Sequence, residues 1–478
     1  MTSSTLSRRD MLRAMASATA YASLGGGLTV ATMNDAQAQA TDYKALVCVF
    51  LFGGNDGFNT IVPIDTRYAA YAQRRGYMAL PQASLLQIDA AYGLHPAMAP
   101  LQRAYTEGWM AGLLNVGPLA RPFRDKADFL AVRNSPDPKV VPQGLFSHSD
   151  QQNVWELGDT NVFQTTTGWG GRLVDAAALN VLYSFGGSAR FTVSARSSTL
   201  AMPGPGATFG LEGIGDDSWA RARRTALETL SNASSPNALH NAYATIQRQA
   251  LTTSTVLNPI IRQRPTDTGA DPDNPEISAA FGNLARNTVY AGSLSQQLYQ
   301  VAKLIKNRSR LGGNRHVFFV SLGGFDTHEG QISSGDSTAG AHANLLGQVA
   351  TALSSFHKSM ADLGVMNNVT SFTMSDFGRT FKPNNSRGTD HGYGNINLIL
   401  GGSVKGGQMY GTYPDTTLGG PDDAGKDTWE WQGRWIPKVG VDQYAHTLIK
   451  WFTPSVDTAA ILPNLANFST RDLGFMKP

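Results

Sequence analysis

Apolar runs of strand length alternate with longer amphipathic stretches in the first part of this chain. An apolar run at 44–52 stops at Gly53 and Gly54, as expected for a strand that is buried on both faces of a parallel sheet. A helical pattern follows at 95–108, and a second apolar run at 110–117. Strand, helix and strand in this order predict a β-α-β start to an α/β fold.

The middle of the chain interrupts this alternation. Residues 120–170 are polar and contain prolines, so they predict a loop-rich stretch, whereas 180–212 predict short strands, one of them at 190–195. A block at about 213–312 predicts mostly helices, as an insertion or a helical cap. The alternation then returns, with strands predicted at 315–322, 368–375 and 395–402 and helices at 340–364 and 441–452. We therefore expect one α/β domain over 41–478, with a mostly parallel central sheet and a largely helical insertion.

The N-terminus predicts a targeting segment. Arg8 and Arg9 precede a stretch of small, weakly apolar residues, and Ala-x-Ala sites end at Ala38 or Ala40. This combination resembles a twin-arginine export signal over 1–40, which implies passage through the twin-arginine export machinery and a periplasmic or secreted location. No later stretch approaches 18 consecutive apolar residues, so we expect no stable membrane insertion.

Composition narrows the function classes. The net charge of +3 is spread without long basic runs, which argues against nucleic acid as a partner. The chain has one cysteine, Cys48, so an intrachain disulfide and a cysteine-based zinc site are both excluded. Cys48 lies inside the first apolar run, where a small buried hydrophobic residue is expected.

Three of the predicted strands are followed by acidic residues. Asp56 follows the first strand, Asp326 and His328 follow the strand at 315–322, and Asp376 follows the strand at 368–375. Ligands of open α/β sheets bind outside the carboxyl ends of the strands, so these side chains are expected at one rim. Unpaired carboxylates there would repel each other, and a divalent cation removes that cost. The pattern therefore predicts a site for one or more ions of zinc, manganese, magnesium or calcium.

Two polar loops offer further candidates for the same site. The stretch "GTDHG" places Asp390 and His391 between glycines, which allow the backbone to approach a ligand closely. The stretch "FSHSDQQNVW" carries Ser147, His148 and Asp150. Each element alone is a weak signal, because Asp beside glycine is common in turns.

The stretch "SDFGR" contains the D-F-G of protein kinases, at Asp376 to Gly378. A kinase also needs a glycine-rich loop, a strand lysine and an H-R-D loop upstream, and this sequence has none of them. Asp376 is therefore interpreted as one strand-end acid among three.

The chain resembles a family of exported bacterial proteins, the domain-of-unknown-function family 1501, over roughly residues 43–478. The segments that carry the resemblance are "VFLFGGNDGFNTIVP", "YGLHPAMAPLQRAYTEG", "FSHSDQQNVWELG", "TGWGGRL", "LGGFDTHEGQ", "HANLLGQVATALSSF", "SDFGRTFKPNNSRGTDHGYGNINLILGG" and "GRWIPKVGVDQYAHTLIKWF". That family is similar to the alkaline phosphatase superfamily, which includes sulfatases. The resemblance implies a three-layer alkaline phosphatase-like fold with metals at the C-terminal rim of the sheet.

The resemblance also implies roles for individual residues. Asp56 corresponds to the first-strand metal ligand, and Ser147 lies where a nucleophile is expected. The remaining metal-site residues that the resemblance implies are Asp326, His328, Asp376 and His391, and the glycine-flanked loop adds Asp390 as a further candidate ligand. Phe377 stands where the superfamily often has a histidine.

Two functions are compatible with these features. The first is an exported metal-dependent hydrolase of phosphate or sulfate esters, acting on a small-molecule or polymeric anionic substrate. In it, Ser147 attacks the ester, His148 or Asp150 assists proton transfer or binds metal, and Arg379 clamps a substrate oxygen. The alternative is a non-catalytic exported binding or assembly protein that keeps this fold, which Phe377 favours.

Overall fold

The described part of the chain, in a computed structural model, comprises residues 42–478 except 180, 211–212, 215–216, 234, 265–270 and 283–292. The predicted signal segment, 1–40, lies outside the described residues.

Nine strands of the described chain form one central sheet, in the order β11-β5-β10-β9-β1-β8-β6-β7, with β12 also paired to β5. The strands are β1 (Lys44–Leu51), β5 (Met110–Gly117), β6 (Val181–Ser184), β7 (Ser198–Ala201), β8 (Arg315–Leu322), β9 (Val369–Ser375), β10 (Asn395–Leu400), β11 (Met409–Gly411) and β12 (Val439–Gly440). β10 runs antiparallel to both of its neighbours, and the other pairs are parallel. The sheet is therefore mostly parallel, as predicted.

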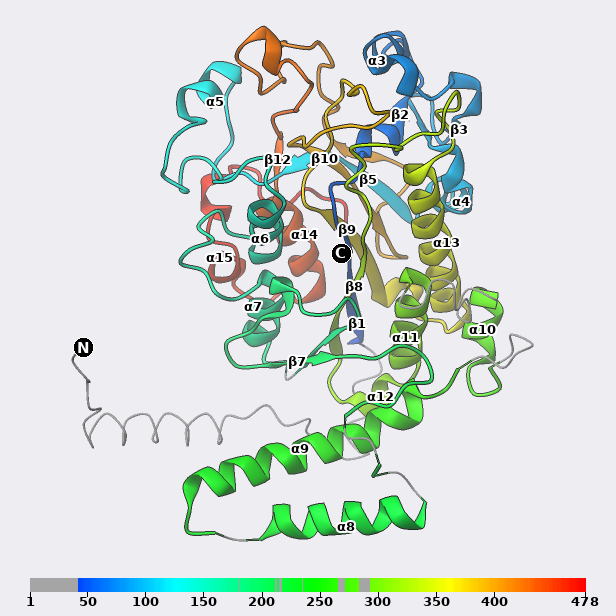
Figure 1. Cartoon of the computed structure of the whole chain (residues 1–478), viewed down its shortest axis with the longest axis vertical. Helices are drawn as coiled ribbons and strands as arrows, with labels where there is room; N and C mark the ends of the chain where they lie inside the picture. The colour runs from blue at the N-terminus through cyan, green and yellow to red at the C-terminus, as the bar shows by residue number, and fades with distance from the viewer. Residues whose placement is uncertain are drawn as a thin grey trace, which may run out of the picture.

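The two faces of the sheet carry separate hydrophobic cores. Successive side chains of β1 point to opposite faces, so Val47 and Val49 join one core while Cys48 and Phe50 join the other. The first face is covered by α4 (Ala99–Thr106), α10 (Pro275–Phe281), α11 (Leu294–Lys306) and α13 (Ala341–Asp362). The second is covered by α6 (His148–Leu157), α7 (Trp169–Ala176), α14 (Val441–Phe452) and α15 (Thr458–Ile461). The predicted α/β three-layer architecture is confirmed (Figure 1).

A smaller sheet and several short helices complete the end of the molecule where β1 finishes. This antiparallel sheet has the order β2-β4-β3. The elements are β2 (Ile61–Pro63), α3 (Tyr68–Arg75), β3 (Leu86–Gln87), β4 (Tyr92–Leu94) and α5 (Lys126–Val132).

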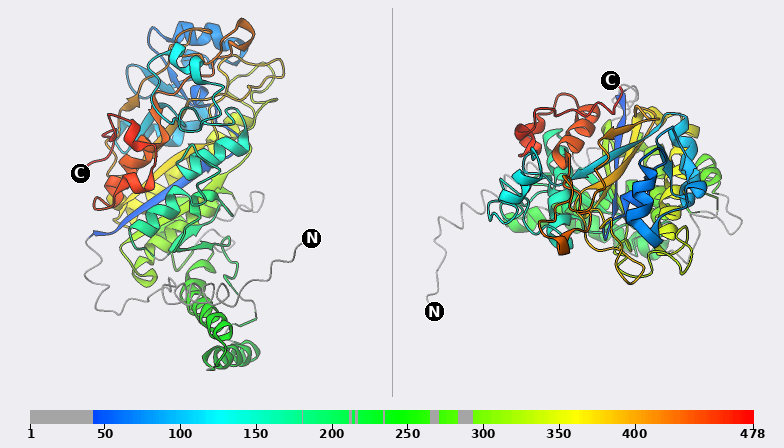
Figure 2. Two further views of the ribbon diagram at one scale, coloured as in Figure 1. Left: turned by 90° about the vertical axis from the view of Figure 1, so that its left-hand side faces the viewer. Right: turned by 90° about the horizontal axis from the view of Figure 1, so that it is seen from above.

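Two helices from the predicted helical block form a projecting hairpin. α8 (Ser218–Asn232) and the outer part of α9 (Ala238–Ile261) lie side by side, at the end of the molecule where β1 begins (Figures 1 and 2). The inner end of α9 is anchored because Leu257, Ile260 and Ile261 are buried in the core. The same block continues into α11 and α12 (Arg308–Leu311), and α11 packs directly on β8.

One local prediction was wrong. Residues 190–195 do not form a strand, because Arg190–Thr192 is a 3-10 turn packed tightly against α7. A Cβ on Gly168 would lie 2.0 Å from the Arg190 carbonyl oxygen, so glycine there permits this contact. The stretch 120–170 is loop-rich as predicted, and it also contains α5, α6 and the start of α7.

Candidate metal centre

Three loops meet at the carboxyl ends of β1, β8 and β9. Directly after β1, Gly53 and Gly54 have φ values of +114° and +85°, which favour glycine. A Cβ on Gly53 would lie 2.3 Å from the backbone nitrogen of Asp326, and one on Gly54 would lie 2.6 Å from the ring of Phe377. The glycine pair that ends the first strand therefore lets the loops after β8 and β9 close onto the loop after β1.

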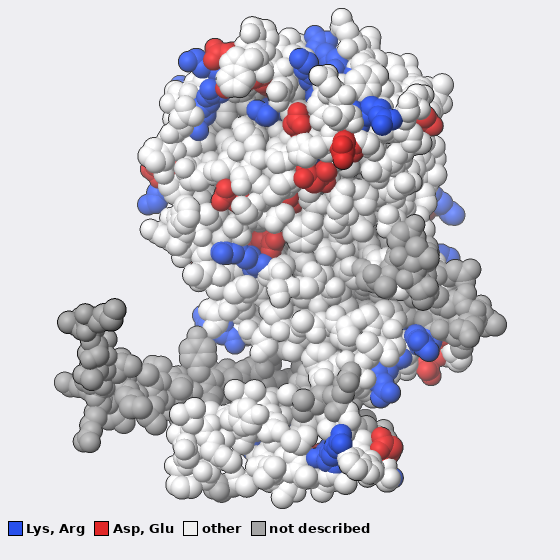
Figure 3. All heavy atoms as spheres, in the orientation of Figure 1, with Lys and Arg blue, Asp and Glu red and all other residues white. Residues whose placement is uncertain are grey.

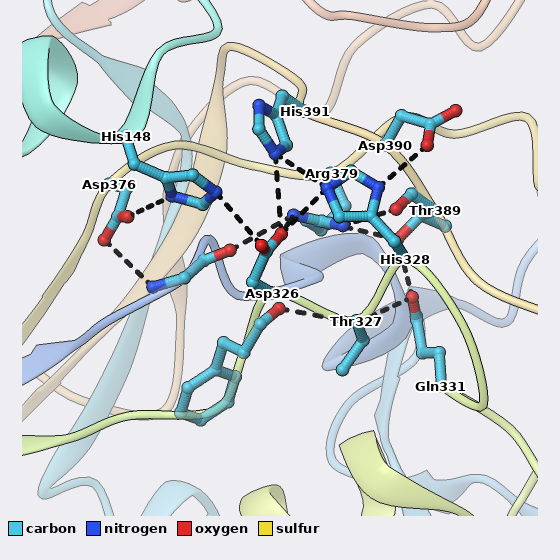
Figure 4. Close-up of polar contacts among 12 residues, drawn as sticks. His148, Asp326, Thr327, His328, Gln331, Asp376, Arg379, Thr389, Asp390 and His391 are labelled. Carbon is cyan, nitrogen blue, oxygen red and sulfur yellow. Dashed lines mark hydrogen bonds and ion pairs between the residues drawn. The ribbon is translucent and has the colours of Figure 1, made fainter.

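Four metal-ligating side chains converge where these loops meet (Figure 4). One ligand atom from each of His148, Asp326, His328 and His391 lies within 4.8 Å of all the others. The Asp326 carboxylate lies 3.0 Å from His328 Nε2, 3.4 Å from His391 Nε2 and 3.3 Å from His148 Nε2. All three imidazoles thus present Nε2 to one carboxylate.

The opposite nitrogen of each ring is held by an acceptor. His148 Nδ1 lies 2.6 Å from Asp376 Oδ2, and His328 Nδ1 lies 3.0 Å from Asp390 Oδ1. His391 Nδ1 lies 2.6 Å from the carbonyl oxygen of Phe146. Metal-binding histidines are commonly oriented by such contacts, which fix the proton on Nδ1. Asp376 and Asp390, predicted as ligands, contact the outer nitrogens of His148 and His328 in this structure.

In this arrangement, lone pairs on the Nε2 atoms of the histidines face one another. If Nδ1 of His328 and of His391 donate outward, neither Nε2 carries a proton, yet these two nitrogens are only 2.8 Å apart. His148 Nε2 is buried and has no hydrogen-bond partner within the described structure. Lone pairs and a carboxylate at this separation repel each other, and a divalent cation between them removes the repulsion. The residues present therefore fit a metal ion.

Asp326 is fixed in the cluster by a buried arginine. Arg379 Nη1 donates to Asp326 Oδ1 at 2.8 Å and to the Gly53 carbonyl oxygen at 3.1 Å. Its Nε donates to Thr389 Oγ1 at 3.2 Å. Partial burial opposes ionisation of Asp326, but the Arg379 hydrogen bond and charge lower the pKa of this carboxyl below its usual value. Arg379 is itself only 1% exposed. The predicted role as a substrate clamp is thus not supported, because the guanidinium is occupied inside the protein.

The cluster is open to solvent on one side. The side chains of Asp326 and His328 are 44% and 43% exposed, whereas that of Asp376 is fully buried. On the upper part of the face seen in Figure 3, acidic and basic side chains are interspersed. The hydrogen bond to Asp376 raises the pKa of His148, and burial lowers the pKa of His391.

Asp56 is not part of this cluster. Its carboxylate forms a fully buried ion pair with Arg75 at the end of α3, and it accepts a hydrogen bond of 2.6 Å from Gln331. Burial opposes the charge on Asp56, but the Arg75 charge lowers the pKa of this carboxyl overall. The acid predicted as the first metal ligand is therefore neutralised by an arginine that the sequence analysis did not single out.

Ser147 and Asp150 also lie outside the four-residue cluster. Ser147 precedes the first residue of α6, and its Oγ lies 3.3 Å from Ser149 Oγ. Asp150 is in the first turn of the same helix. The roles of Ser147 as a nucleophile and of Asp150 in proton transfer therefore stay predictions.

Sequence reasoning missed two supporting contacts of the site. Gln152 lies one helical turn after His148 on α6, and its amide donates to Asp376 Oδ2 at 2.8 Å. The Phe146 carbonyl binds His391 from the segment just before α6. The spacing of His148 and Gln152 could have suggested a shared partner, whereas a backbone contact has no signal in the sequence.

Residues 227–422 match the model of the family described as Protein of unknown function (DUF1501). The match covers Asp326, His328 and His391, and it confirms the predicted family resemblance over that segment. No curated protein matches the chain.

Several solved structures show a remote likeness. The PsFucS1 sulfatase from Pseudoalteromonas sp. is 8% identical with a TM-score of 0.33, over 99% of this chain and 78% of that one. The C-terminal periplasmic domain of EcEptC from Escherichia coli is 10% identical with a TM-score of 0.32, over 92% and 88%. A variant of the alkaline phosphatase PafA is 10% identical with a TM-score of 0.27, over 71% and 64%. The α/β architecture stated above follows from the sheet order and layers of this chain.

Among the described helices, none is both long enough and apolar enough to cross a bilayer.

Proposed function

We propose that this protein is an exported hydrolase of phosphate or sulfate esters that uses one divalent cation held by His148, Asp326, His328 and His391. The observation that carries the proposal is the convergence of three imidazole nitrogens and one carboxylate, each fixed from behind by its own partner. Its location in the periplasm or outside the cell belongs to the same proposal and rests on the twin-arginine-like N-terminus.

The donor set narrows the choice of metal. Imidazole nitrogen suits zinc and other transition metals, whereas magnesium and calcium prefer oxygen ligands. With three nitrogens and one carboxylate, zinc is favoured over magnesium and calcium among the four predicted ions, and manganese stands between them.

The residues of the chain do the positioning. When bound, the cation supplies Lewis-acid polarisation of an ester oxygen and neutralises charge on the transferred group. Asp376 and Asp390 hold the imidazole rings of His148 and His328, while Arg379 holds Asp326. The half-exposed side of Asp326 and His328 is where an anionic ester can approach. We propose that water, rather than Ser147, attacks the ester, and the Ser147→Ala variant described below tests this choice.

One observation favours the alternative, a non-catalytic binding protein. The structure leaves the two residues predicted for attack and for substrate clamping, Ser147 and Arg379, in other contacts. Such a protein would keep the cation but lack turnover.

The experiment combines metal analysis with a substrate panel. Full-length protein, purified without chelator, is measured by elemental analysis and assayed on phosphate monoesters, phosphate diesters and sulfate esters with added zinc or manganese. We expect one cation per chain, and turnover that His328→Ala abolishes and Ser147→Ala retains. His240→Ala, on the distant α9, is the matched control.

The outcomes separate the two functions. Bound cation without turnover on any ester would support the binding protein, whereas protein that takes up no divalent cation would overturn both.

A further inference from the structure

Exposed apolar side chains concentrate on the projecting hairpin of α8 and α9. Nine large hydrophobic residues in the described chain are exposed, and five of them lie on these two helices. They are Trp219, Leu230, Leu239, Tyr243 and Ile246. Scattered surface hydrophobics need no explanation, but a concentration of this kind marks an interaction surface.

These side chains lie on one face of the hairpin. Trp219 and Leu230 each directly precede a buried residue of α8, and Tyr243 directly precedes the buried Ala244 of α9. The two helices run in opposite directions, so the same one-residue offset turns both exposed rows toward the same side. The hairpin therefore has one apolar face that nothing in the described structure covers.

Helix α8 gains little from the rest of the protein. Its fifteen residues contain only two that are buried, Ala220 and Ser231. Most helix stability in proteins comes from burying an apolar face, and this helix buries almost none. A partner that covers the face would supply the missing burial.

The charge of the hairpin indicates the kind of partner. The two helices carry four arginines and one acidic residue, Glu228, and α9 has no acidic residue. The guanidinium of Arg223 lies 4.4 Å from the ring centre of Trp219, so a positive charge borders the apolar face itself. In a symmetric dimer through this face, Arg223 would approach an identical face with the same charge. A negatively charged surface has no such cost.

A cavity extends the apolar face toward the body of the protein. It has a volume of about 430 Å³ and lies between α9, the edge strand β7 and its neighbour β6. Ile246 belongs to both the exposed face and the cavity wall. The other apolar side chains of the wall include Val181, Leu200, Phe209, Ile214 and Leu251. The cavity has the size and lining of a site for an apolar chain.

We propose that the α8–α9 hairpin is a peripheral docking surface for an anionic lipid bilayer. Its apolar face lies among the upper acyl chains, while the arginines meet the lipid phosphates. Helices with aromatic and aliphatic residues on one face and arginine nearby bind at membrane interfaces in this way. The proposal does not rest on the hydrolase function, because the hairpin lies at the other end of the sheet from the metal centre (Figures 1 and 2).

The experiment is vesicle co-sedimentation of the full chain. Vesicles of phosphatidylcholine alone are compared with vesicles that also contain phosphatidylglycerol, at low and high salt. We expect binding to the anionic vesicles that weakens with salt. Replacing Leu239, Tyr243 and Ile246 together by serine should lower the partition coefficient at least about tenfold. Burial of even one such aliphatic or aromatic side chain in the bilayer changes the partition coefficient by about that factor.

Matched controls separate this effect from general hydrophobicity. Phe163→Ser with Trp429→Ser removes equally exposed apolar side chains outside the hairpin and should leave binding unchanged. Trp219→Phe should abolish a vesicle-induced blue shift of tryptophan fluorescence that Trp429→Phe retains. Arg221→Gln with Arg223→Gln should weaken binding to anionic vesicles and reduce its dependence on salt.

Three results would overturn the proposal. One is equal vesicle binding by the triple serine variant and wild type. Residues 1–41 are identical in both proteins, so binding through that segment alone would give this result. Another is equal binding to neutral and anionic vesicles. The third is a dimer in light scattering that the triple variant dissociates, without any vesicle binding.

Discussion

Asp326 and Asp56 both follow a buried strand and a glycine pair, yet they are neutralised in different ways. Asp326 is half-exposed and has Arg379 on one side, but three imidazole nitrogens face it on the other, so a cation can still be added there. Asp56 is fully buried and already has Arg75 beside it. The same local sequence signal therefore marks a candidate cation site in one place and an internal ion pair in the other. The residue that decides between them comes from a distant element.

The largest expected effect is on cation binding. Asp326→Ala should lose the cation entirely, because it removes the only carboxylate among the four converging groups. The double variant Asp56→Leu with Arg75→Met should keep one cation per chain, since a buried ion pair can be replaced by apolar residues with little cost. Elemental analysis after gel filtration measures both. A double variant without metal would show that Asp56 is a ligand, so that Asp56 and Asp326 would not differ in their roles.

Breaking the internal pair on one side only should destabilise the fold. Arg75→Met leaves Asp56 buried without its partner, and we expect a loss of about 3–5 kcal/mol in the free energy of unfolding. Urea denaturation of metal-loaded protein measures it, and the double variant should recover most of the loss. Equal stability of the single and double variants would argue against a charge effect at Asp56.

A smaller effect on cation affinity is expected from Asp390, which contacts His328 from the side away from the cluster. Asp390→Asn keeps all four converging groups but weakens the contact that orients His328, so cation affinity should fall about 10–100-fold. Competition with a chromogenic chelator gives the affinity. Asp150→Asn, in the first turn of α6 next to His148, is the control and should not change it. If both variants bind like wild type, the contact between Asp390 and His328 does not orient the ligand.

Asp442 is neutralised in a third way, by keeping its proton. Of the expected effects, its effect on the free energy of unfolding is the smallest. Burial, reinforced by nearby Asp159, raises the pKa of Asp442 to about 8. The folded protein then keeps a proton that the unfolded chain has lost, so the stability of wild type should fall as pH rises from 6 to 7, by at most about 1.4 kcal/mol through Asp442. Asp442→Asn should make this slope smaller in urea denaturation, and Glu156, whose pKa burial raises to about 7, still contributes to it. An identical slope in the variant would mean that Asp442 is ionised in the folded state.

The sheet was largely predictable because its strands are marked locally. The runs at β1, β5 and β8 are mainly apolar, β9 is rich in Val, Thr, Phe and Met, and the structure places all four strands as predicted. Helix α6 was not predicted, since its buried apolar residues Val154, Trp155 and Leu157 all lie at its C-terminal end. Its first turn is polar because it faces the metal centre.

The candidate site was predictable in position but not in roles. All four converging residues were singled out, since acids and histidines after strands share a rim. Whether an acid contacts a metal or a histidine depends on distances that no spacing specifies, as Asp376 and Asp390 show. The pairing of Asp56 with Arg75 depends on how α3 folds back over the end of β1, which periodicity does not encode.

The metal centre draws together three stretches that are far apart along the chain: the start of α6, the loop after β8 and the loop before β10. A cation held there works as a removable cross-link, comparable to a disulfide in a protein that has only one cysteine. Since α6 covers one face of the sheet, chelation should loosen that cover first and expose the segment around His148 to proteases. Binding of the ion would therefore stabilise the layer of helices that contains α6.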